Sequence, residues 1–302
     1  MTTTDQTIPY QRTALLGFEQ PLADFFRSLG AKNRSDATLL AYETDLRQFF
    51  AFLAANNVAA TRPESVERVD VVEFLADLGS RGVSGVSRAR KLAAIREFCR
   101  FLVTNETVSR SPADGVETPR RERNVRTYLR PEEYSRMLAL AGSNARDYAM
   151  LETFLQTGVR VSELCALTLD DVDLDGHVVR VRGKGMVARE IDLERNGLLA
   201  LKSWLSVRPL AMSNHVFLNK DGQPFSVRGV RKLVEKYRRR AGIARRASCH
   251  SLRHTFATYK AERGISAFQL QRWLGHASVA TTQIYVHLGR QNARKLMEAT
   301  SL

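Results

Sequence analysis

The residues that could carry chemistry in this chain are basic side chains and one tyrosine, each on its own short motif. They are Arg160 in Thr-Gly-Val-Arg, Lys184 in Gly-Lys-Gly, His250 and Arg253 in His-Ser-Leu-Arg, His276 in Leu-Gly-His, and Tyr285 nine residues after that histidine. Arginine stays protonated and binds phosphate oxygens bidentately, so two arginines can surround one phosphate. A tyrosine beside that phosphate can attack it. Together these residues predict an enzyme that breaks and rejoins DNA through a phosphotyrosine.

Four of the basic residues suit the handling of a phosphate. Arg160 and Arg253 would neutralise the charge that grows on the non-bridging oxygens during displacement. His250 lies three residues before Arg253, so both face the same side of a helix, where a histidine can hydrogen-bond the phosphate or move a proton. His276 precedes a new helix and is placed to reach a shared centre. For His254, beside the His-x-x-Arg pair, we expect a structural or supporting role.

The other two residues would exchange the bonds. Lys184 lies between two glycines at a hairpin tip, and a lysine whose pKa is lowered by nearby cations can protonate the leaving alkoxide. Tyr285 would be the nucleophile, although its phenol, with a reference pKa of about 10, needs activation. A phosphotyrosine link stores the bond energy, so we expect neither metal nor ATP as cofactor. The acidic run 171–176 opens like a calcium loop, but Arg182 stands where such a loop needs glutamate.

Each motif taken alone has a plainer interpretation. A His-x-x-Arg pair on a helix is usually a surface or capping feature, and Gly-Lys-Gly is usually just a turn. Thr-Gly-Val-Arg is more often a helix junction, and a tyrosine that ends a helix is usually partly packed. The assembly of all of them by chance in one basic chain is improbable, so the combination favours the enzyme.

Composition narrows the class of protein and its partner. The chain has 302 residues, of which 44% are apolar and 26% charged, as in a soluble globular protein of two domains. It shows no signal peptide or long apolar run, and its three cysteines fit a reducing compartment, so we expect a cytoplasmic protein. Residues 127–302 hold 28 Lys and Arg against 16 Asp and Glu, most of the net charge of +14. That excess predicts a polyanionic partner, most simply DNA.

The first hundred residues read as helices. Apolar residues recur at three- and four-residue steps between Leu39 and Leu53, which is typical of an amphipathic helix. Asp70 is placed to cap a helix with Val72 on its apolar face, and Ser87 to cap another that runs to Leu102. With a further helix near residues 22–29, the pattern predicts a small four-helix unit.

The rest of the chain predicts a linker and a second domain that is mainly helical. Residues 106–126 contain two prolines, a glycine and a run of arginines, which is a linker composition. The apolar pattern then predicts a β-hairpin around the Gly-Lys-Gly turn, over residues 178–193. Residues 130–133, with a proline and two acids, start a helix, and helical patterns occupy residues 146–156, 226–241, 251–263, 266–274 and 278–285. The predicted fold class is therefore mainly α with a small antiparallel β-sheet.

These motifs resemble those of the tyrosine recombinase (phage integrase) family, and within it the Xer-type recombinases. The matching stretches are residues 157–164, 183–185, 250–258 and 274–285, and the likeness extends over roughly residues 17–300. The resemblance implies that Arg160 and Arg253 are phosphate clamps, Lys184 the general acid, His250 an acid/base residue, and Tyr285 the nucleophile of a 3′-phosphotyrosyl link. His276 matches a position where members carry His or Trp, and Glu163 an acidic position that supports the site.

The resemblance also implies an organisation and an assembly. A helical, SAM-like core-binding domain over residues 17–105 and a catalytic domain with a C-terminal tail over residues 127–302 would form a C-shaped clamp on duplex DNA. Four copies, or copies of two related recombinases, would assemble on two sites and exchange strands through a Holliday junction. The tail after Tyr285 would dock on a neighbouring copy or pack on its own domain.

Two other functions remain open at this point. A type IB-like topoisomerase or telomere resolvase would use the same chemistry without exchanging partners. A DNA-binding protein without enzymatic activity, such as a repressor, would need the basic charge and the helices but not Tyr285 or Lys184.

Overall fold

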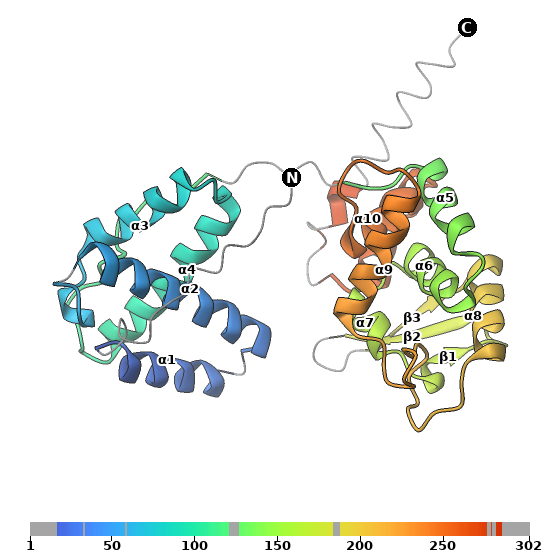
Figure 1. Cartoon of the computed structure of the whole chain (residues 1–302), viewed down its shortest axis with the longest axis horizontal. Helices are drawn as coiled ribbons and strands as arrows, with labels where there is room; N and C mark the ends of the chain where they lie inside the picture. Colours follow the sequence, from blue (N-terminus) through green and yellow to red (C-terminus); the bar gives the residue numbers. More distant parts are fainter. Residues whose placement is uncertain are drawn as a thin grey trace, which may run out of the picture. The chain divides into compact units, whose positions relative to one another are not determined.

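The computed structural model describes residues 17–32, 34–57, 59–120, 127–183, 188–276, 279 and 282–285. The chain divides into two compact units, Met1–Asn124 and Val125–Leu302. Both are built mainly of helices, and the second also contains a three-stranded antiparallel sheet (Figure 1). The predicted fold class is confirmed. Among the described residues, no helix combines the length and the apolar character that crossing a membrane requires.

The first unit is a bundle of four helices around aromatic side chains. The helices are α1 (Glu19–Ala31), α2 (Asp36–Asn56), α3 (Arg68–Ser80) and α4 (Gly85–Thr104), with a short 3-10 turn at Pro63–Ser65. Phe18 stacks on Phe50 with ring centroids 4.4 Å apart, and Phe25 meets Phe98 edge to face at 5.4 Å. The apolar periodicity that predicted these helices therefore marks the side that packs inward.

Two helix starts differ from those predicted. Helix α3 begins at Arg68, so Asp70 lies inside its first turn, where its carboxylate accepts a hydrogen bond from the backbone N–H of Glu67 at 2.8 Å. Ser84, not Ser87, caps α4, and its hydroxyl accepts from the N–H of Ser87. On α3, Val72 is exposed, contrary to the prediction, and its neighbour Val71 is buried on the apolar face instead.

The early part of the predicted linker packs on the helical unit. Ala113 and Val116 belong to the buried core of that unit. The guanidinium group of Arg96 on α4 donates to the carbonyl oxygen of Val116 and, at 3.0 Å, to the hydroxyl of Thr118. Residues up to 118 are thus tied to the four helices, whereas residues 121–126 lie outside the described part of the chain.

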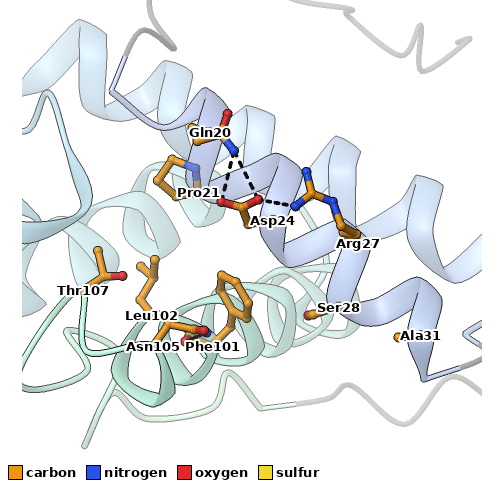
Figure 2. Close-up of a pocket in the computed structure, with 10 residues that line it drawn as sticks. All are labelled: Gln20, Pro21, Asp24, Arg27, Ser28, Ala31, Phe101, Leu102, Asn105 and Thr107. Atoms are coloured by element: carbon orange, nitrogen blue, oxygen red, sulfur yellow. Dashed lines mark hydrogen bonds and ion pairs between the residues drawn. The ribbon is translucent and has the colours of Figure 1, made fainter.

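A hollow of about 530 Å³ lies between α1 and the end of α4 (Figure 2). Three charged or polar side chains at its edge come from α1 and pair with one another. Gln20 donates to both carboxylate oxygens of Asp24 at 3.1 Å, and Arg27 pairs with the same carboxylate at 2.9 Å. Phe101 and Leu102 of α4 line the hollow from the other side. The hollow is thus a product of helix packing in which these polar groups satisfy each other.

The second unit surrounds the central helix α6 (Ala145–Thr157). Its other helices are α5 (Pro131–Ala141), α7 (Val161–Ala166), α8 (Arg195–Val207), α9 (Val227–Arg240), α10 (Cys249–Glu262) and α11 (Ala267–Leu274). The buried face of α8, with Leu198, Leu201 and Trp204, packs beside α6. Sequence reasoning did not predict α8, although its apolar residues recur at helical steps.

The sheet has the order β1-β2-β3 and is antiparallel throughout. Strands β2 (Val178–Arg182) and β3 (Ala188–Asp192) form the predicted hairpin, and β1 (Val172–Asp173) adds a short edge that was not predicted. Residues 184–187, which include Lys184, lie outside the described residues. Asp171 ends a short 3-10 turn, Leu169–Asp171, and its carboxylate accepts hydrogen bonds from the backbone N–H and the hydroxyl of Thr168.

Gly158 sets the path of the chain between α6 and α7. It ends α6 with φ +60°, in the left-handed region. A Cβ atom at this position would lie 2.3 Å from a ring carbon of Phe256 on α10. Only glycine meets both requirements without strain. The close approach of α10 to this turn brings Arg253 against it.

We predict that Asp45→Ala destabilises the first unit by about 3 to 5 kcal/mol. The carboxylate of Asp45 is fully buried and accepts from Lys91 at 2.8 Å and from Arg90. Its removal would leave the buried ammonium group of Lys91 without its counter-charge. Hydrogen exchange of α2 and α4 in the full chain measures the loss, because both tryptophans lie in the second unit.

The control for this prediction is Asp77→Ala, which removes a solvent-exposed ion pair with Arg81. We expect it to change stability by less than about 1 kcal/mol. Equal protection of α2 and α4 in the two variants would contradict a structural role for the buried pair.

Candidate active site

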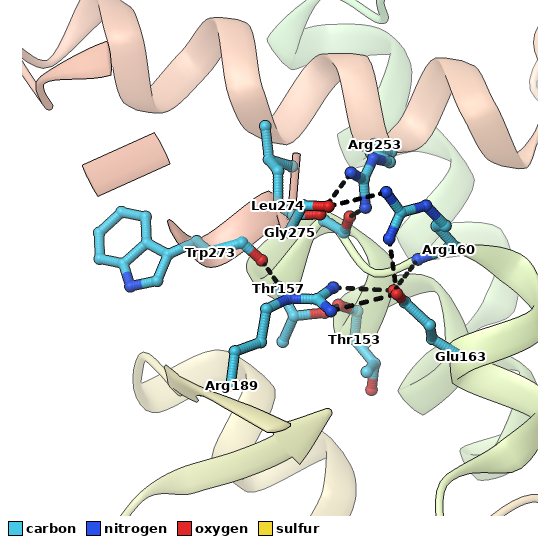
Figure 3. A network of polar contacts seen from close by, with 10 residues as sticks. Thr153, Thr157, Arg160, Glu163, Arg189, Arg253, Trp273, Leu274 and Gly275 are labelled. Carbon is cyan, nitrogen blue, oxygen red and sulfur yellow. Dashed lines mark hydrogen bonds and ion pairs between the residues drawn. The ribbon is translucent and has the colours of Figure 1, made fainter. Parts of the chain in front are cut away.

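Three arginines and one glutamate form a polar cluster where α7, β3, α10 and the end of α11 meet (Figure 3). Glu163 lies at its centre. One carboxylate oxygen of Glu163 accepts from the guanidinium groups of Arg160 at 2.8 Å and Arg189 at 3.1 Å. The other accepts from the backbone N–H of Arg160 at 2.7 Å and from Arg189 at 2.8 Å. Both oxygens are therefore shared between the same two arginines.

The sequence Arg-Val-Ser-Glu makes this arrangement locally favourable. Arg160 flanks the first turn of α7 in an extended backbone conformation, and Glu163 is the third helical residue. A glutamate at that position can reach back to the N–H before the helix, as in a capping box. The carboxylate of Glu163 thus both caps α7 and holds the side chain of Arg160. This arrangement is compatible with the supporting role expected of Glu163.

Arg253 projects from α10 into this cluster and is only 2% exposed. Its guanidinium group donates to the carbonyl oxygens of Gly158 at 2.7 Å and Leu274 at 2.6 Å. Burial, and then the nearby charge of Arg160, lower the pKa of Arg253 to about 10. The group therefore remains a cation at neutral pH although it is removed from water.

Backbone carbonyl groups at the end of α11 accept hydrogen bonds from all three arginines. The carbonyl of Trp273 accepts from Arg189 at 2.6 Å, that of Leu274 from Arg253, and that of Gly275 from Arg160 at 3.0 Å. The carbonyl groups at a helix C-terminus carry partial negative charge and have no partner inside the helix. Three consecutive carbonyls thus orient three cations toward one place.

The cluster carries more positive than negative charge. Three guanidinium groups surround the single carboxylate of Glu163, which leaves a surplus of two positive charges among these residues. A phosphodiester under attack by a phenolate carries about two negative charges in its transition state. A fixed surplus of this size, partly shielded from water, stabilises such a state more than the singly charged ground state.

Burial by itself would raise the pKa of the Glu163 carboxyl, but the hydrogen bonds outweigh it. The hydrogen bonds from the Arg189 side chain and from the backbone N–H of Arg160 have the largest lowering effect. Together with the other bonds they hold the pKa of the Glu163 carboxyl below its ordinary value. Glu163 is therefore ionised at neutral pH, as its role as counter-charge requires.

Tyr285 lies beside α10, and its hydroxyl group is hydrogen-bonded to Nδ1 of His254. The side chain is 1% exposed and packs with Phe256, Leu270 and Leu274. It lies close enough to Arg253 to act on the pKa of that arginine. The expected nucleophile and one expected clamp are therefore neighbours, on the two sides of His254.

His254 contacts the hydroxyl of Tyr285 directly, which is compatible with the structural or supporting role expected of it. His250, one turn earlier on α10, packs edge to face against it with ring centroids 4.3 Å apart. His250 is exposed, whereas His254 is buried. The two rings thus form a row on α10 that leads from the surface to the tyrosine hydroxyl.

His276 follows the left-handed residue Gly275, which ends α11. Its Nδ1 lies 2.9 Å from the hydroxyl of Thr282, in the short helical segment that carries Tyr285. Its position is thus linked both to the helix end that binds the arginines and to the nucleophile. Lys184 lies outside the described residues, so its place in the site stays a prediction.

Arg189 was missed in the sequence. It stands on β3, two residues before the buried Ile191 and therefore on the same face of the strand. Side chains alternate along a strand, so this face points inward and the arginine on it needs a buried partner. That alternation is the signal that could have identified Arg189, because a buried cation is normally paired.

Comparison with known proteins gives matches along nearly the whole chain. Residues 127–292 match the family model described as "Phage integrase family", and residues 22–106 match "Phage integrase, N-terminal SAM-like domain". Tyrosine recombinase XerC of Pelobacter propionicus is 36% identical over 279 residues, which cover 89% of this chain and 92% of the relative. Tyrosine recombinase XerD of Bifidobacterium longum is 34% identical over 290 residues, covering 90% and 94% of the two chains.

Solved structures share the fold. The crystal structure of the XerH site-specific recombinase bound to palindromic difH substrate, a post-cleavage complex, aligns with a TM-score of 0.74 at 24% identity, covering 90% of this chain and 81% of that one. A lambda integrase dimer bound to a COC′ core site aligns with a TM-score of 0.72 at 18% identity, covering 89% and 76%. At these identities the likeness concerns the fold alone.

We predict that Glu163→Gln destabilises the second unit by about 3 kcal/mol near neutral pH, because it removes a buried counter-charge. The folded-state pKa of Glu163 is depressed, so its stabilisation is complete above the unfolded pKa of about 4.3. It is lost as pH falls through the lower folded pKa. The difference between wild type and variant should therefore shrink below about pH 4.

Tryptophan fluorescence during urea unfolding measures this difference, because Trp204 and Trp273 both lie in the second unit. The matched control is Glu190→Gln, which removes an exposed partner of Arg180. If the difference in the free energy of unfolding between wild type and Glu163→Gln stayed constant from pH 7 to pH 3, the carboxylate charge would contribute nothing to stability.

Proposed function

The chain belongs to the phage integrase family and is a tyrosine site-specific recombinase that acts on DNA; on that premise we propose that Tyr285 attacks a DNA phosphate held by Arg160 and Arg253. The observation that carries the proposal is the charge of the cluster, in which Arg160 and Arg189 share the one carboxylate of Glu163 and Arg253 lies close by, held by the carbonyls of Gly158 and Leu274. An anion is the ligand that such a site favours.

The proposed reaction conserves the number of phosphoester bonds. The oxygen of Tyr285 forms a bond to phosphorus, and the bond from phosphorus to the 5′ oxygen breaks. The phenol proton leaves to a base, and Lys184 gives a proton to the 5′ oxygen. The 3′-phosphotyrosyl link is then attacked by the 5′ hydroxyl of a second strand, which releases the tyrosine. No external energy is needed, because each step replaces one phosphoester by another.

The two remaining histidines have complementary proposed roles. His250 is exposed on the first turn of α10, where it can meet the phosphate or exchange a proton with it. His276 stands at the end of α11 beside the carbonyls that hold the arginines. From there it can donate a hydrogen bond to a non-bridging oxygen, which adds to the charge stabilisation by Arg160 and Arg253.

Tyr285 must change its surroundings before it can react. Its hydroxyl is buried and bound to His254 in this structure, whereas attack requires contact with phosphorus at about 3 to 3.5 Å. The described contacts are therefore those of a resting state. We propose that binding of DNA, together with contacts between recombinase copies, moves the segment that carries Tyr285 into the site.

We propose that a surface on α9 contacts the DNA backbone. Exposed basic side chains follow this helix at steps of three and four residues, namely Arg228, Arg231, Lys232, Lys236 and Arg239. Two other arginines, on α9 and just after it, are less exposed and are bound within the fold. Arg238 pairs with Glu235, and Arg245 with Glu133. The exposed set supplies the sequence-independent part of the affinity for DNA.

The assembly follows by analogy with the relatives. XerH is described on a palindromic DNA substrate, and lambda integrase as a dimer on a core site. We propose that this chain also binds a DNA recombination site. Four copies, identical or of two related recombinases, would exchange strands through a Holliday junction. The expected docking of the tail after Tyr285 concerns residues outside the described ones.

We predict that wild-type protein forms covalent adducts with DNA and that Tyr285→Phe forms none. Fragmented host DNA is incubated with protein, quenched in denaturant, and the DNA that stays bound to protein is sequenced. Adducts that cluster at one sequence identify the target. The matched control is Tyr259→Phe, which removes a hydroxyl on α10 that accepts from Arg263, and it should form adducts at the wild-type rate. Adducts in Tyr285→Phe would contradict the assignment of the nucleophile.

We predict that Lys184→Ala slows cleavage of the captured site by about 100-fold to 10,000-fold, because the 5′ alkoxide leaves without a proton. A substrate with sulfur in place of the bridging 5′ oxygen tests this role, because a thiolate needs no protonation to leave. The variant should cleave that substrate at nearly the wild-type rate. Lys202→Ala, an exposed lysine on α8, is the control. An equal defect on both substrates would exclude Lys184 as the acid.

A further inference from the structure

Arg189 connects three parts of the candidate site from below (Figure 3). Its side chain is 11% exposed and uses three of its nitrogens. Nη1 and Nη2 donate to the two oxygens of Glu163 at 3.1 and 2.8 Å, and Nε donates to the carbonyl of Trp273 at 2.6 Å. Its backbone belongs to β3, the strand that follows Lys184 in the sequence. One side chain thus joins the hairpin, the start of α7 and the end of α11.

The first of these contacts fixes the orientation of Glu163. Its two oxygens are the ones that hold the backbone and the side chain of Arg160. Two parallel hydrogen bonds from a guanidinium group define the plane of a carboxylate, which a single bond does not. The direction in which Arg160 points, at the mouth of the cluster with 43% of its side chain exposed, therefore depends on Arg189.

The second contact fixes the turn at the end of α11. Arg189 holds the carbonyl of Trp273, and the next two carbonyls hold Arg253 and Arg160. A Cβ atom on Gly275 would lie 3.1 Å from Nη1 of Arg189, so the turn approaches the guanidinium group closely. A shift of this turn would move the partners of both proposed clamps together.

Arg189 also changes the charge that a phosphate meets. Its positive charge offsets the negative charge of Glu163, with which it forms the more buried of the two ion pairs in the cluster. The charges of Arg160 and Arg253 are then left for the ligand. Without Arg189, the carboxylate would be neutralised by Arg160, and the surplus would fall from two charges to one.

We propose that Arg189 is the positioning residue of the phosphate clamp. It does not touch the DNA itself, and it acts by holding Glu163 and the end of α11 so that Arg160 and Arg253 face one phosphate. The inference rests on the proposed function of the site. It goes beyond that function because it gives a role in catalysis to a strand residue that lies behind the reacting atoms.

The first measurement compares single-turnover cleavage by wild type, Arg189→Gln and Arg189→Lys. The substrate is a duplex oligonucleotide with the sequence captured by wild-type protein, at saturating concentration. We expect Arg189→Gln to cleave about 100-fold more slowly, the effect of a misplaced catalytic group. Arg189→Lys keeps the charge without the paired hydrogen bonds, so its rate should lie between the two. Affinity for the duplex should change less than about threefold, because a buried side chain makes no phosphate contact.

The control is Arg180→Gln on the adjacent strand β2. Arg180 also pairs with carboxylates across the sheet, those of Asp173 and Glu190, but it is exposed. It should cleave at the wild-type rate. Tryptophan fluorescence in urea confirms that each variant is folded under the assay conditions, so that an unfolded protein is not counted as a slow one.

A second substrate separates positioning from a merely structural role. Replacing one non-bridging oxygen of the reacting phosphate by a methyl group removes the negative charge that the clamp must neutralise. If Arg189 acts through Arg160 and Arg253, the defect of Arg189→Gln in adduct formation should shrink at least tenfold on this methylphosphonate. The variant Arg160→Ala should show the same relief, and the double variant should be no slower than Arg160→Ala alone.

Two results would overturn the inference. One is a wild-type rate for Arg189→Gln on the phosphodiester. The other is an undiminished defect on the methylphosphonate, with additive effects in the double variant, which would indicate a general loosening of the fold. Failure of the proposed function is distinguishable from both, since wild-type protein would then form no adduct with either substrate.

Discussion

The sharing of one carboxylate between two guanidinium groups is the interaction on which the candidate site depends. Glu163 is buried, and so is most of Arg189, so neither charge is tolerable without the other. The pair can form only where β3, the start of α7 and the end of α11 come together, and that meeting point is set by the packing of the second unit. The pair also holds the side chain of Arg160. Because Arg189 offsets the charge of Glu163, the cluster keeps an excess of positive charge, which favours the binding of an anion.

The C-terminal end of α11 is the second feature on which the cluster depends. The carbonyls of residues 273–275 turn toward the cluster because Gly275 leaves the helix in the left-handed conformation. Gly158 plays the same part for α6, and its carbonyl also binds Arg253. Backbone groups that helices leave without partners thus bind the arginines from one side.

Much of this could be predicted from the sequence, because the informative residues are few and chemically distinctive. Arg160, Arg253 and Glu163 are brought together as their types and motifs indicated, and Tyr285 lies next to α10. The mainly helical fold and the hairpin followed from apolar periodicity. Arg189 escaped notice because arginine is common in a basic chain, and only the alternation along β3 shows that this one points inward. The contact of His254 with Tyr285 could not be predicted, because the two residues lie 31 positions apart in the sequence.

Other errors came from local signals that tertiary contacts override. Asp70 and Ser87 are good capping residues by type, but each helix begins two residues earlier, at Arg68 and Gly85, so that both residues lie inside the first turn. Strand β1 has two residues, too few to show any periodicity. It exists because β2 offers an edge to pair with. The position of Tyr285 against His254 depends on the packing of separate helical segments, which no spacing in the sequence reveals.

The burial of the Tyr285 hydroxyl against His254 bears on how such an enzyme tells one DNA sequence from another. A copy that meets random DNA in this state holds its hydroxyl against an imidazole rather than against a phosphate, so encounter alone does not nick the strand. If Tyr285 acts as proposed, part of the binding free energy at the correct site would be spent on exposing its side chain. Two sequences bound with similar affinity would then differ in the rate at which they are cut, and discrimination between them would be kinetic.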